Sequence, residues 1–400
     1  MYFWENEKVI LRMVDSSDAS VFEEHLKDTV GRMQSDHGIA LPSTPQTAAD
    51  MVNYALEGID EGEELWFAIM NHEEEMVGYA VIDWMNERMA NTQININIFE
   101  GFRRCGYATS AAGILMEYVF YERRFHKLGC CVLEGNEAGN EFVKSIGFSL
   151  DGFRSEMFYT NGRYVGEYYY SILEDEFEAG IRRRDNYDIP DSDIGRTDIP
   201  ADKPVRPGMN GSYFWNYDGI ILRDMTEEDY IKNHEMIYDT QSCVFFDSDV
   251  KLPKFEEELS DHEKAHLNFN CDDDRIEFAV CNEEGEYVGC INVCGLDRKN
   301  GKFSYSNYTL KAHRGKGYAT KALRLILWYC FMELRMHKMI CCVNDENNGS
   351  AAVMRKVGCH VEGVLRDNEY YHGKFVDAVM FGISKEEFMK FNGLHGEWNE

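Results

Sequence analysis

Two short segments of the sequence place basic residues and glycines directly before a run of helix-forming residues. They are EGFRRCGYATSAA at 100–112 and KAHRGKGYATKAL at 311–323. The first turn of a helix has unpaired backbone N–H groups and the positive end of the helix dipole, so it attracts anions. Glycine lets an anion approach the backbone closely, and Arg314 and Lys316 add positive charge. The second segment therefore predicts a site for a pyrophosphate group.

Known phosphate-binding patterns do not describe this turn. The G-x-x-x-x-G-K-[ST] pattern of a Walker A loop is absent. The G-x-G-x-x-G pattern of dinucleotide-binding folds is matched only by Gly315 and Gly317. The alternative is an ordinary helix start with exposed basic side chains, and the elements around the turn favour the anion site.

The two segments are corresponding parts of an internal repeat with an offset of 211 residues. HKLGCCV at 126–132 corresponds to HKMICCV at 337–343, and the match needs no gap. A period of this length indicates two whole domains rather than a solenoid of small units.

The segment between the repeats has the composition of a linker. Residues 182–211 contain four of the seven prolines, with several aspartates and no apolar period. We therefore expect a first domain at 1–180, a linker at 181–211 and a second domain at 212–400. Each domain then has a normal size for an independently folding unit.

Both repeats show the same order of predicted elements. Residues 93–99 alternate between polar and apolar side chains, which is typical of a strand with one buried face, and 304–310 form the corresponding strand. Asn161-Gly162 and His372-Gly373 are hairpin turns. In the first repeat the remaining predicted elements are strands at 64–70, 76–84 and 129–133 and helices at 106–125 and from Asn136. In the second repeat they are strands at 275–281, 286–294 and 340–344 and helices at 317–336 and from Asn347. This order of elements predicts a mixed α/β sheet in each repeat.

The composition excludes some classes of function. A formal net charge of −30 argues against a nucleic-acid partner, because phosphates would be repelled; it is compatible with a cationic substrate, or with solubility alone.

No segment is long and apolar enough to span a bilayer, and the first residues do not resemble a signal peptide, so we expect a cytoplasmic protein without a membrane partner. The 12 cysteines lack zinc-site spacing; we expect no metal and interpret them as buried apolar residues.

The ordered set of elements and motifs resembles the GNAT acyltransferase superfamily and, within it, the RimJ/RimL-type branch. In the second repeat the resemblance rests on Arg314, Gly317 and Ala319, on Asn347 with Ser350, and on EGVLRDNEYYHGKFVDAVMFGI at 362–383. In the first repeat it rests on Arg103, Gly106 and Ala108 and on NEAGNEFVKSIGF at 136–148. The resemblance implies two tandem GNAT folds and an acetyl-CoA-dependent N-acetyltransferase.

The resemblance also implies which residues hold acetyl-CoA. The end of the polar-faced strand pairs with the pantetheine arm, the turn holds the pyrophosphate, and the start of the next helix lines the pantetheine end. In the second repeat these residues are Tyr308, Thr309, Leu310, Arg314, Gly315, Lys316, Gly317, Tyr318, Ala319, Thr320, Asn347 and Ser350. In the first repeat they are Arg103, Arg104, Gly106, Ala108 and Asn136.

The second repeat matches the family pattern more closely than the first. The first repeat has Arg104, Cys105, Gly139 and Gly166 where the second has Gly315, Lys316, Ser350 and Asp377. We therefore expect the better acetyl-CoA site in the second repeat.

The resemblance implies direct attack of a neutral amine on the thioester carbonyl. Many GNAT enzymes protonate the leaving thiolate with a tyrosine four residues before the glycine that ends the helix, but these positions are Val143 and Met354 here. We expect Tyr308, Ser350 or an ordered water to act as the catalytic acid instead. The alternatives are a packed aromatic ring for Tyr308 and a helix-capping hydroxyl for Ser350. No carboxylate stands out as the base.

The acceptor is predicted only by class, as a primary amine that is cationic in solution. A protein N-terminus, a polyamine and an aminoglycoside all fit. The alternative function is a non-catalytic module, in which one or both repeats bind acyl-CoA without turnover or act only as a structural partner. Burial of Trp4 and Trp215 at a shared interface would favour a pseudo-dimer within one chain, and a homodimer is the other arrangement.

Overall fold

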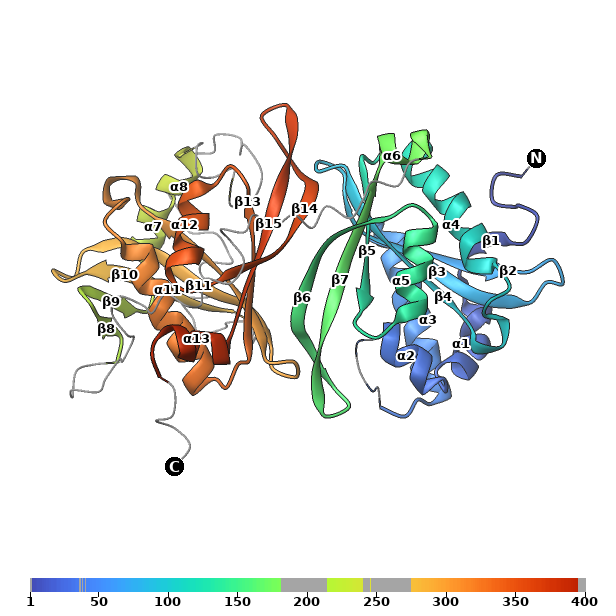
Figure 1. The fold of residues 1–400 in the computed structure, drawn as a ribbon, viewed down its shortest axis with the longest axis horizontal. Coiled ribbons are helices and arrows are strands. Elements are labelled where there is room, and N and C mark those ends of the chain that lie inside the picture. The colour runs from blue at the N-terminus through green and yellow to red at the C-terminus, as the bar shows by residue number, and fades with distance from the viewer. Residues whose placement is uncertain are drawn as a thin grey trace. The chain divides into compact units, whose positions relative to one another are not determined.

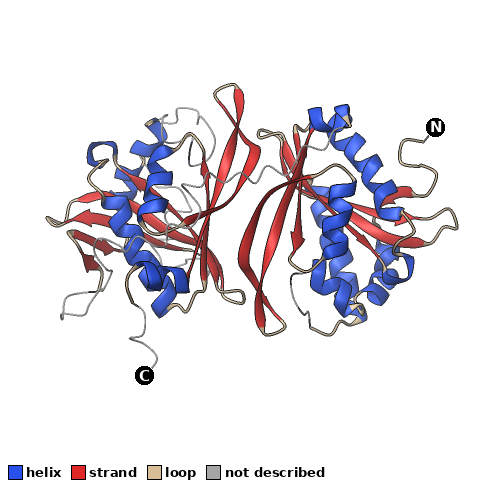
Figure 2. Cartoon of the chain, in the orientation of Figure 1, coloured by secondary structure: helices blue, strands red, loops and turns tan. Residues whose placement is uncertain are grey.

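Each repeat forms a mixed sheet with helices on both of its faces in the computed structural model of the protein (Figures 1 and 2). The structure describes residues 2–35, 37, 39, 41–180, 214–239, 245 and 275–394. The chain divides into two compact units, Met1–Tyr187 with Leu365–Tyr370, and Asp188–Val364 with Tyr371–Glu400. The linker predicted at 181–211 lies outside the described residues.

The sheet of the first repeat has the strand order β1-β2-β3-β4-β5-β7-β6. Its neighbouring strands are antiparallel except for the parallel pair β4 and β5. The strands are β1 Ile10–Met13, β2 Leu65–Met70, β3 Met76–Asn86, β4 Asn91–Ile98, β5 Lys127–Leu133, β6 Ser149–Thr160 and β7 Arg163–Leu173. The helices are α1 Ala19–His25, α2 Thr29–Ser35, α3 Pro45–Glu61, α4 Tyr107–Glu117, α5 Glu137–Ser145 and α6 Glu174–Ala179.

The sheet of the second repeat has the order β8-β9-β10-β11-β12-β13-β15-β14. The strands are β8 Asn216–Tyr217, β9 Ile220–Arg223, β10 Ile276–Asn282, β11 Tyr287–Asp297, β12 Lys302–Thr309, β13 Lys338–Asn344, β14 His360–Tyr371 and β15 Lys374–Ser384. The helices are α7 Glu227–Asn233, α8 Glu235–Tyr238, α11 Tyr318–Trp328, α12 Asn348–Lys356 and α13 Lys385–Phe391. The predicted mixed α/β fold and its repetition are confirmed.

The alternating strands separate two apolar layers, although the sequence predicts strands with one buried and one polar face. On β12, Phe303 and Tyr305 pack into the core beneath α11, whereas Tyr308 packs into a separate cluster on the opposite face. The predicted turn at Asn161-Gly162 joins β6 and β7 with φ values of 49° and 78°, which suits a tight two-residue turn. The alternation of side chains along the strands and the turn residues therefore determine which face each side chain occupies and the register of the hairpin.

The helices before β2 were not predicted from the sequence, although α3 carries clear end signals. Thr44 and Thr47 form a capping box, Pro45 is the first helical residue, and Gly62 ends the helix with φ 76°. The apolar side of α3 packs on the face of the first sheet opposite α4. Because α3 covers one face of the sheet, the glycine turn lies on the other face, together with α4.

The parallel pairing between β12 and β13 ends after two residues. Lys302 pairs with Lys338 and Phe303 with Met339, and the ladder then stops. Beyond this point β12 remains paired with β11, and β13 remains paired with β15. The two strands therefore diverge and leave one backbone edge of β12 facing a gap. In the first repeat, β4 and β5 separate in the same way after three pairs.

A buried ion pair connects β13 to β14 inside the second repeat. The Lys338 ammonium bonds to the Glu362 carboxylate, and the two side chains are 1% and 2% exposed. Two charges removed from water in this way stabilise the fold only while they remain together.

We expect Lys338→Met to destabilise the second repeat by about 3 kcal/mol, because Glu362 would lose its buried cation. The double variant Lys338→Met/Glu362→Gln carries no buried charge at this point and should be more stable than the single variant. Urea unfolding of the full chain followed by circular dichroism measures both. A single variant as stable as the wild type would contradict this account of the pair.

Candidate acetyl-CoA site

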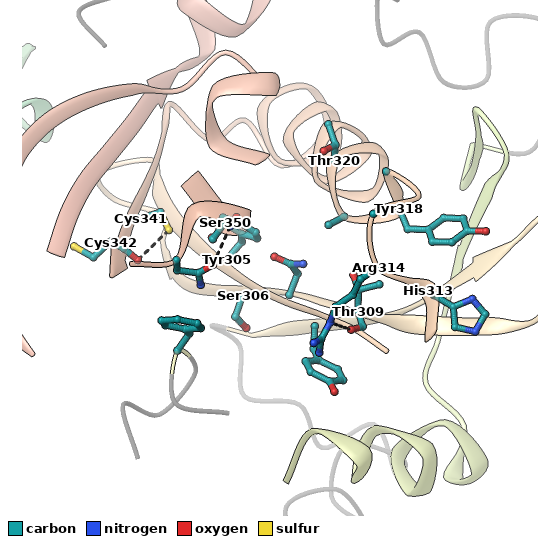
Figure 3. Close-up of a pocket in the computed structure, with 18 residues that line it drawn as sticks. Tyr305, Ser306, Thr309, His313, Arg314, Tyr318, Thr320, Cys341, Cys342 and Ser350 are labelled. Carbon is teal, nitrogen blue, oxygen red and sulfur yellow. Dashed lines mark hydrogen bonds between the residues drawn. The ribbon is translucent and has the colours of Figure 1, made fainter. Parts of the chain in front are cut away.

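A pocket of about 480 Å³ lies in the second repeat where β12 and β13 diverge (Figure 3). The structure brings most of the predicted cofactor residues of this repeat together around it. These are Tyr308, Thr309, Arg314, Gly315, Gly317, Tyr318, Ala319, Thr320, Asn347 and Ser350. Leu310 and Lys316 do not line the pocket, so the site is formed by the ends of the turn and by the strand edge rather than by every residue of the motif.

The turn before α11 is open above its two glycines. Gly315 and Gly317 have φ values of 75° and 85°, and a Cβ added to either would meet no atom within 4 Å. Both conformations are ones that L side chains rarely adopt. The backbone of this turn is therefore exposed to the pocket at the N-terminus of an 11-residue helix, which is the geometry that an anion requires.

Arg314 supports the turn rather than pointing its charge into open space. Its Nε donates to the Thr309 carbonyl at 3.0 Å, and its Nη2 donates to Asp239 Oδ2 at 2.5 Å. Asp239 is 5% exposed, so the contact anchors the turn to a buried carboxylate. The backbone N–H groups of the turn, more than the Arg314 side chain, are therefore available to bind an anion.

The start of α12 contributes Asn347 and Ser350. Asn347 Oδ1 accepts a hydrogen bond from the Ser350 backbone N–H at 3.0 Å and caps the helix. The cap fixes the orientation of the Asn347 carboxamide and leaves its nitrogen as a donor beside the pocket. Asn136 caps α5 in the first repeat with the same geometry.

The two predicted catalytic groups both line the pocket but differ in environment. Tyr308 is 3% exposed, and the Arg314 guanidinium lies 5.3 Å from the centre of its ring. Burial raises the pKa of Tyr308 above its ordinary value. Ser350 lies near the start of α12, on the side of the pocket where Cys341 and Cys342 of β13 lie (Figure 3).

The structure adds pocket residues that the sequence did not suggest. They are Phe245, Tyr305, Ser306, Asn307, His313, Cys341, Cys342 and Gly349. Cys342 is exposed, so the expectation that the cysteines are buried is wrong at this position. The available signal was the adjacent Cys341-Cys342 pair, which begins two residues after Met339, the last residue of β13 that pairs with β12.

The first repeat builds the same turn but fills the space above it. Arg104 takes the left-handed conformation of Gly315, with φ 64°. Lys8 Nζ donates to the Cys105 carbonyl at 2.9 Å, and a Cβ at Gly106 would lie 2.6 Å from this ammonium. Gly106 therefore lies beneath a lysine, unlike the open Gly317.

The polar face of the first sheet carries a carboxylate with an unusual pKa. Asp83 accepts a hydrogen bond from Asn95 at 3.1 Å, and its burial together with the nearby Glu64 raises its pKa to about 6. The corresponding residues of the second repeat are Cys294 and Arg275. The two repeats thus share a scaffold and differ in the chemistry of both sheet faces.

The model of the acetyltransferase (GNAT) domain family matches this chain twice, at residues 8–149 and 220–360. The chain belongs to the GNAT acetyltransferase family. It is an N-acetyltransferase of the type that uses acetyl-CoA as acetyl donor. The residues of the second repeat fit such a group, because the open glycine turn and the strand edge face one pocket.

Several bacterial N-acetyltransferases are similar to parts of this GNAT chain. An uncharacterized N-acetyltransferase, YokL, from the SPbeta prophage of Bacillus subtilis is 28% identical over 44% of this chain and 95% of its own length. The protein named probable N-acetyltransferase YjcK of Bacillus subtilis is 31% identical over 33% of this chain and 68% of its own length. Spermidine N(1)-acetyltransferase of Escherichia coli is 27% identical over 35% of this chain and 73% of its own length.

Two further findings concern the part of the chain that the structure describes. None of its helices combines the length and the apolar character needed to cross a bilayer. No three His, Cys, Asp or Glu side chains there come together as ligands for a metal ion.

The raised pKa of Asp83 predicts a pH-dependent effect of its removal. The folded state holds the proton more tightly than the unfolded state, so this group's contribution to stability falls as pH rises from about 4 to about 6. Asp83→Asn should therefore be more stable than the wild type at pH 8, by on the order of 1–2 kcal/mol after solvent screening, and the difference should fall to about one third of this at pH 4.5.

Thermal unfolding at the two pH values measures the difference. Glu57→Gln makes the same chemical change at an exposed position of the same repeat and should show no such pH dependence. An equal effect of Asp83→Asn at both pH values would contradict the role of its ionisation.

Proposed function

We propose that the second repeat binds acetyl-CoA between β12 and β13 and transfers the acetyl group to a cationic primary amine. The observation that carries this proposal is the open glycine turn at the end of β12, the strand that diverges from β13 after two pairs. Both features present backbone donors to the same pocket. When bound, acetyl-CoA supplies the acetyl group as an activated thioester.

The turn and the strand would divide the binding of the donor between them. Backbone N–H groups of 314–319 would hold the pyrophosphate, with Arg314 keeping the turn in place through Asp239. Beyond its last pair with β13, the edge of β12 from Ser306 to Thr309 would pair with the amide groups of the pantetheine arm, as an added strand does. Asn347 would donate from the start of α12.

Several features support a cationic acceptor. The chain has a formal net charge of −30, which attracts cations over distance. Asp345 follows β13 beside the pocket residue Asn347, and its pKa is raised by burial and by its neighbours Asp377 and Glu346. A relative is named for acetylating spermidine, which is a polyamine. These features favour polyamines, cationic peptide N-termini and aminoglycosides over neutral amines.

We further propose that the chain belongs to the RimJ/RimL-type branch, and the motif at Asn347 and Ser350 and the tail at 362–383 support this proposal. We also propose that the two repeats form a pseudo-dimer within one chain, with a homodimer as the alternative. Light scattering distinguishes them, since a single chain has a mass of 46.4 kDa.

A second function is favoured for the first repeat by the lysine above its turn. The Lys8 ammonium lies 2.6 Å from the position that a Cβ of Gly106 would take, and Arg104 replaces the glycine of the turn. We therefore propose that the first repeat acts as a structural or weakly binding module. In this case one molecule of acetyl-CoA binds per chain.

Matched substitutions in the two turns test which repeat binds the donor. Gly317→Val in the full chain should abolish acetyl-CoA binding in titration calorimetry, because a β-branched side chain would enter the open space and strain a φ of 85°. Gly106→Val introduces the same strain in the first repeat, where φ is 84°, and should leave the affinity unchanged. Normal binding by Gly317→Val would contradict the proposed site.

The side chain of Lys316 should matter much less than the backbone. Lys316→Ala removes an exposed charge that does not line the pocket, so we expect at most a tenfold loss of affinity, or about 1.4 kcal/mol. A loss as large as that of Gly317→Val would show instead that the side chain carries the anion contact.

The charge of the acceptor can be tested by thiol release from acetyl-CoA. Spermidine should react with a KM that rises with ionic strength at constant kcat, because salt screens the attraction of the negative protein. Butylamine provides a monocationic control and should show a weaker salt dependence. Equal reaction of spermidine and a neutral amine, without a salt effect, would contradict a cationic acceptor.

A further inference from the structure

The pocket is lined by a tyrosine that neither sequence reasoning nor the family match singles out. Tyr305 lies on β12, two residues after the last pair with β13, and lines the pocket although it is only 7% exposed. Figure 3 shows it beside Ser350, away from His313 and Tyr318 at the other side of the view. A donor held by its pyrophosphate at the turn would reach this end with its thioester.

The hydroxyl of Tyr305 points at the helix residue where many family members carry a tyrosine. Tyr305 Oη donates to Met354 Sδ at 3.7 Å, and Met354 is completely buried. A thioether sulfur is a weak acceptor. A tyrosine hydroxyl is thus present beside this position of α12, but it comes from β12.

The first repeat shows that the fold does not require a hydroxyl here. Its counterparts of Tyr305 and Met354 are Ile94 and Val143, both buried and apolar. Placing a tyrosine hydroxyl in an apolar core is unfavourable unless the group has a good partner. In the second repeat this core position carries a hydroxyl on a residue that lines the pocket, and packing alone does not explain it.

We propose that Tyr305 is the proton donor to the sulfur of coenzyme A in the acetyl transfer; this inference rests on the proposed acetyl-CoA site of the second repeat. The amine nitrogen bonds to the acetyl carbon while the carbon–sulfur bond breaks and leaves its electron pair on sulfur. Tyr305 gives its hydroxyl proton to that sulfur. The proton lost from the acetylated nitrogen returns to the tyrosine through solvent.

The environment keeps Tyr305 in the form that can donate. Burial, together with the neighbouring thiols of Cys341 and Cys359, raises the pKa of Tyr305 well above its ordinary value, and a contact with the Ser350 side chain acts weakly in the opposite direction. The tyrosine is therefore protonated throughout the physiological range. Tyr308 is less suited, since it belongs to the cluster on the other face of β12 and lies against Arg314.

The proposal is tested without an acceptor by titrating the thiol of bound coenzyme A. Thiolate absorbance near 240 nm is followed against pH in the full-length protein saturated with coenzyme A, and the same titration with desulfo-coenzyme A subtracts the protein's own cysteines. A hydroxyl that donates to sulfur stabilises the thiolate, so Tyr305→Phe should raise the pKa of the bound thiol by about one unit. Tyr287→Phe removes a buried hydroxyl outside the pocket and should leave this pKa unchanged.

Turnover provides the second readout. With spermidine as acceptor, Tyr305→Phe should lower kcat by about 100-fold or more, while the Kd of coenzyme A changes less than threefold. An unchanged thiol pKa in Tyr305→Phe overturns the proposal, and a rise only in Tyr308→Phe transfers the role to Tyr308. A wild-type chain that does not bind coenzyme A overturns the proposed function itself, and the inference with it.

Discussion

The site depends on one interruption of the sheet, the early end of the β12–β13 ladder. Both strands keep their outer partners, so the sheet persists while the inner edge of β12 loses its hydrogen bonds to β13. Backbone groups at such an edge need either water or a ligand as partners. A flexible chain with amide groups can replace the missing strand, and the pocket then extends to the glycine turn at the end of β12. The gap, the glycine turn and Tyr305 therefore come together where β12 and β13 diverge.

The two repeats keep this framework and differ in what surrounds it. Each has a short parallel ladder, a glycine in left-handed conformation at the helix start and an arginine that anchors the turn to a carboxylate. The first repeat has Lys8 above its turn, where the second has open space. It also has Ile94 at the position that Tyr305 takes in the second repeat. Duplication has thus preserved the backbone scaffold more strictly than the groups that could do chemistry.

Local patterns made much of the fold predictable. The hairpin turns, the polar-faced strands and the helix after the glycine turn depend on nearest neighbours in sequence, and each lies where expected. The contacts that define the site connect residues far apart. Arg314 meets Asp239, and Lys8 reaches Cys105, across intervals that no pattern in this sequence encodes. Tyr305 was missed for another reason, because its place on the apolar face of β12 is also that of an ordinary core residue.

A crystal structure of the full chain grown with coenzyme A tests most directly whether the cofactor binds where β12 and β13 diverge. We expect coenzyme A in the second repeat, with the pyrophosphate on the backbone of 314–319, the pantetheine arm along the edge of β12 that diverges from β13, and the thiol beside Tyr305. We also expect no coenzyme A over Gly106 in the first repeat. Coenzyme A bound in the first repeat alone, or bound in the second repeat away from the β12 edge, would contradict this expectation.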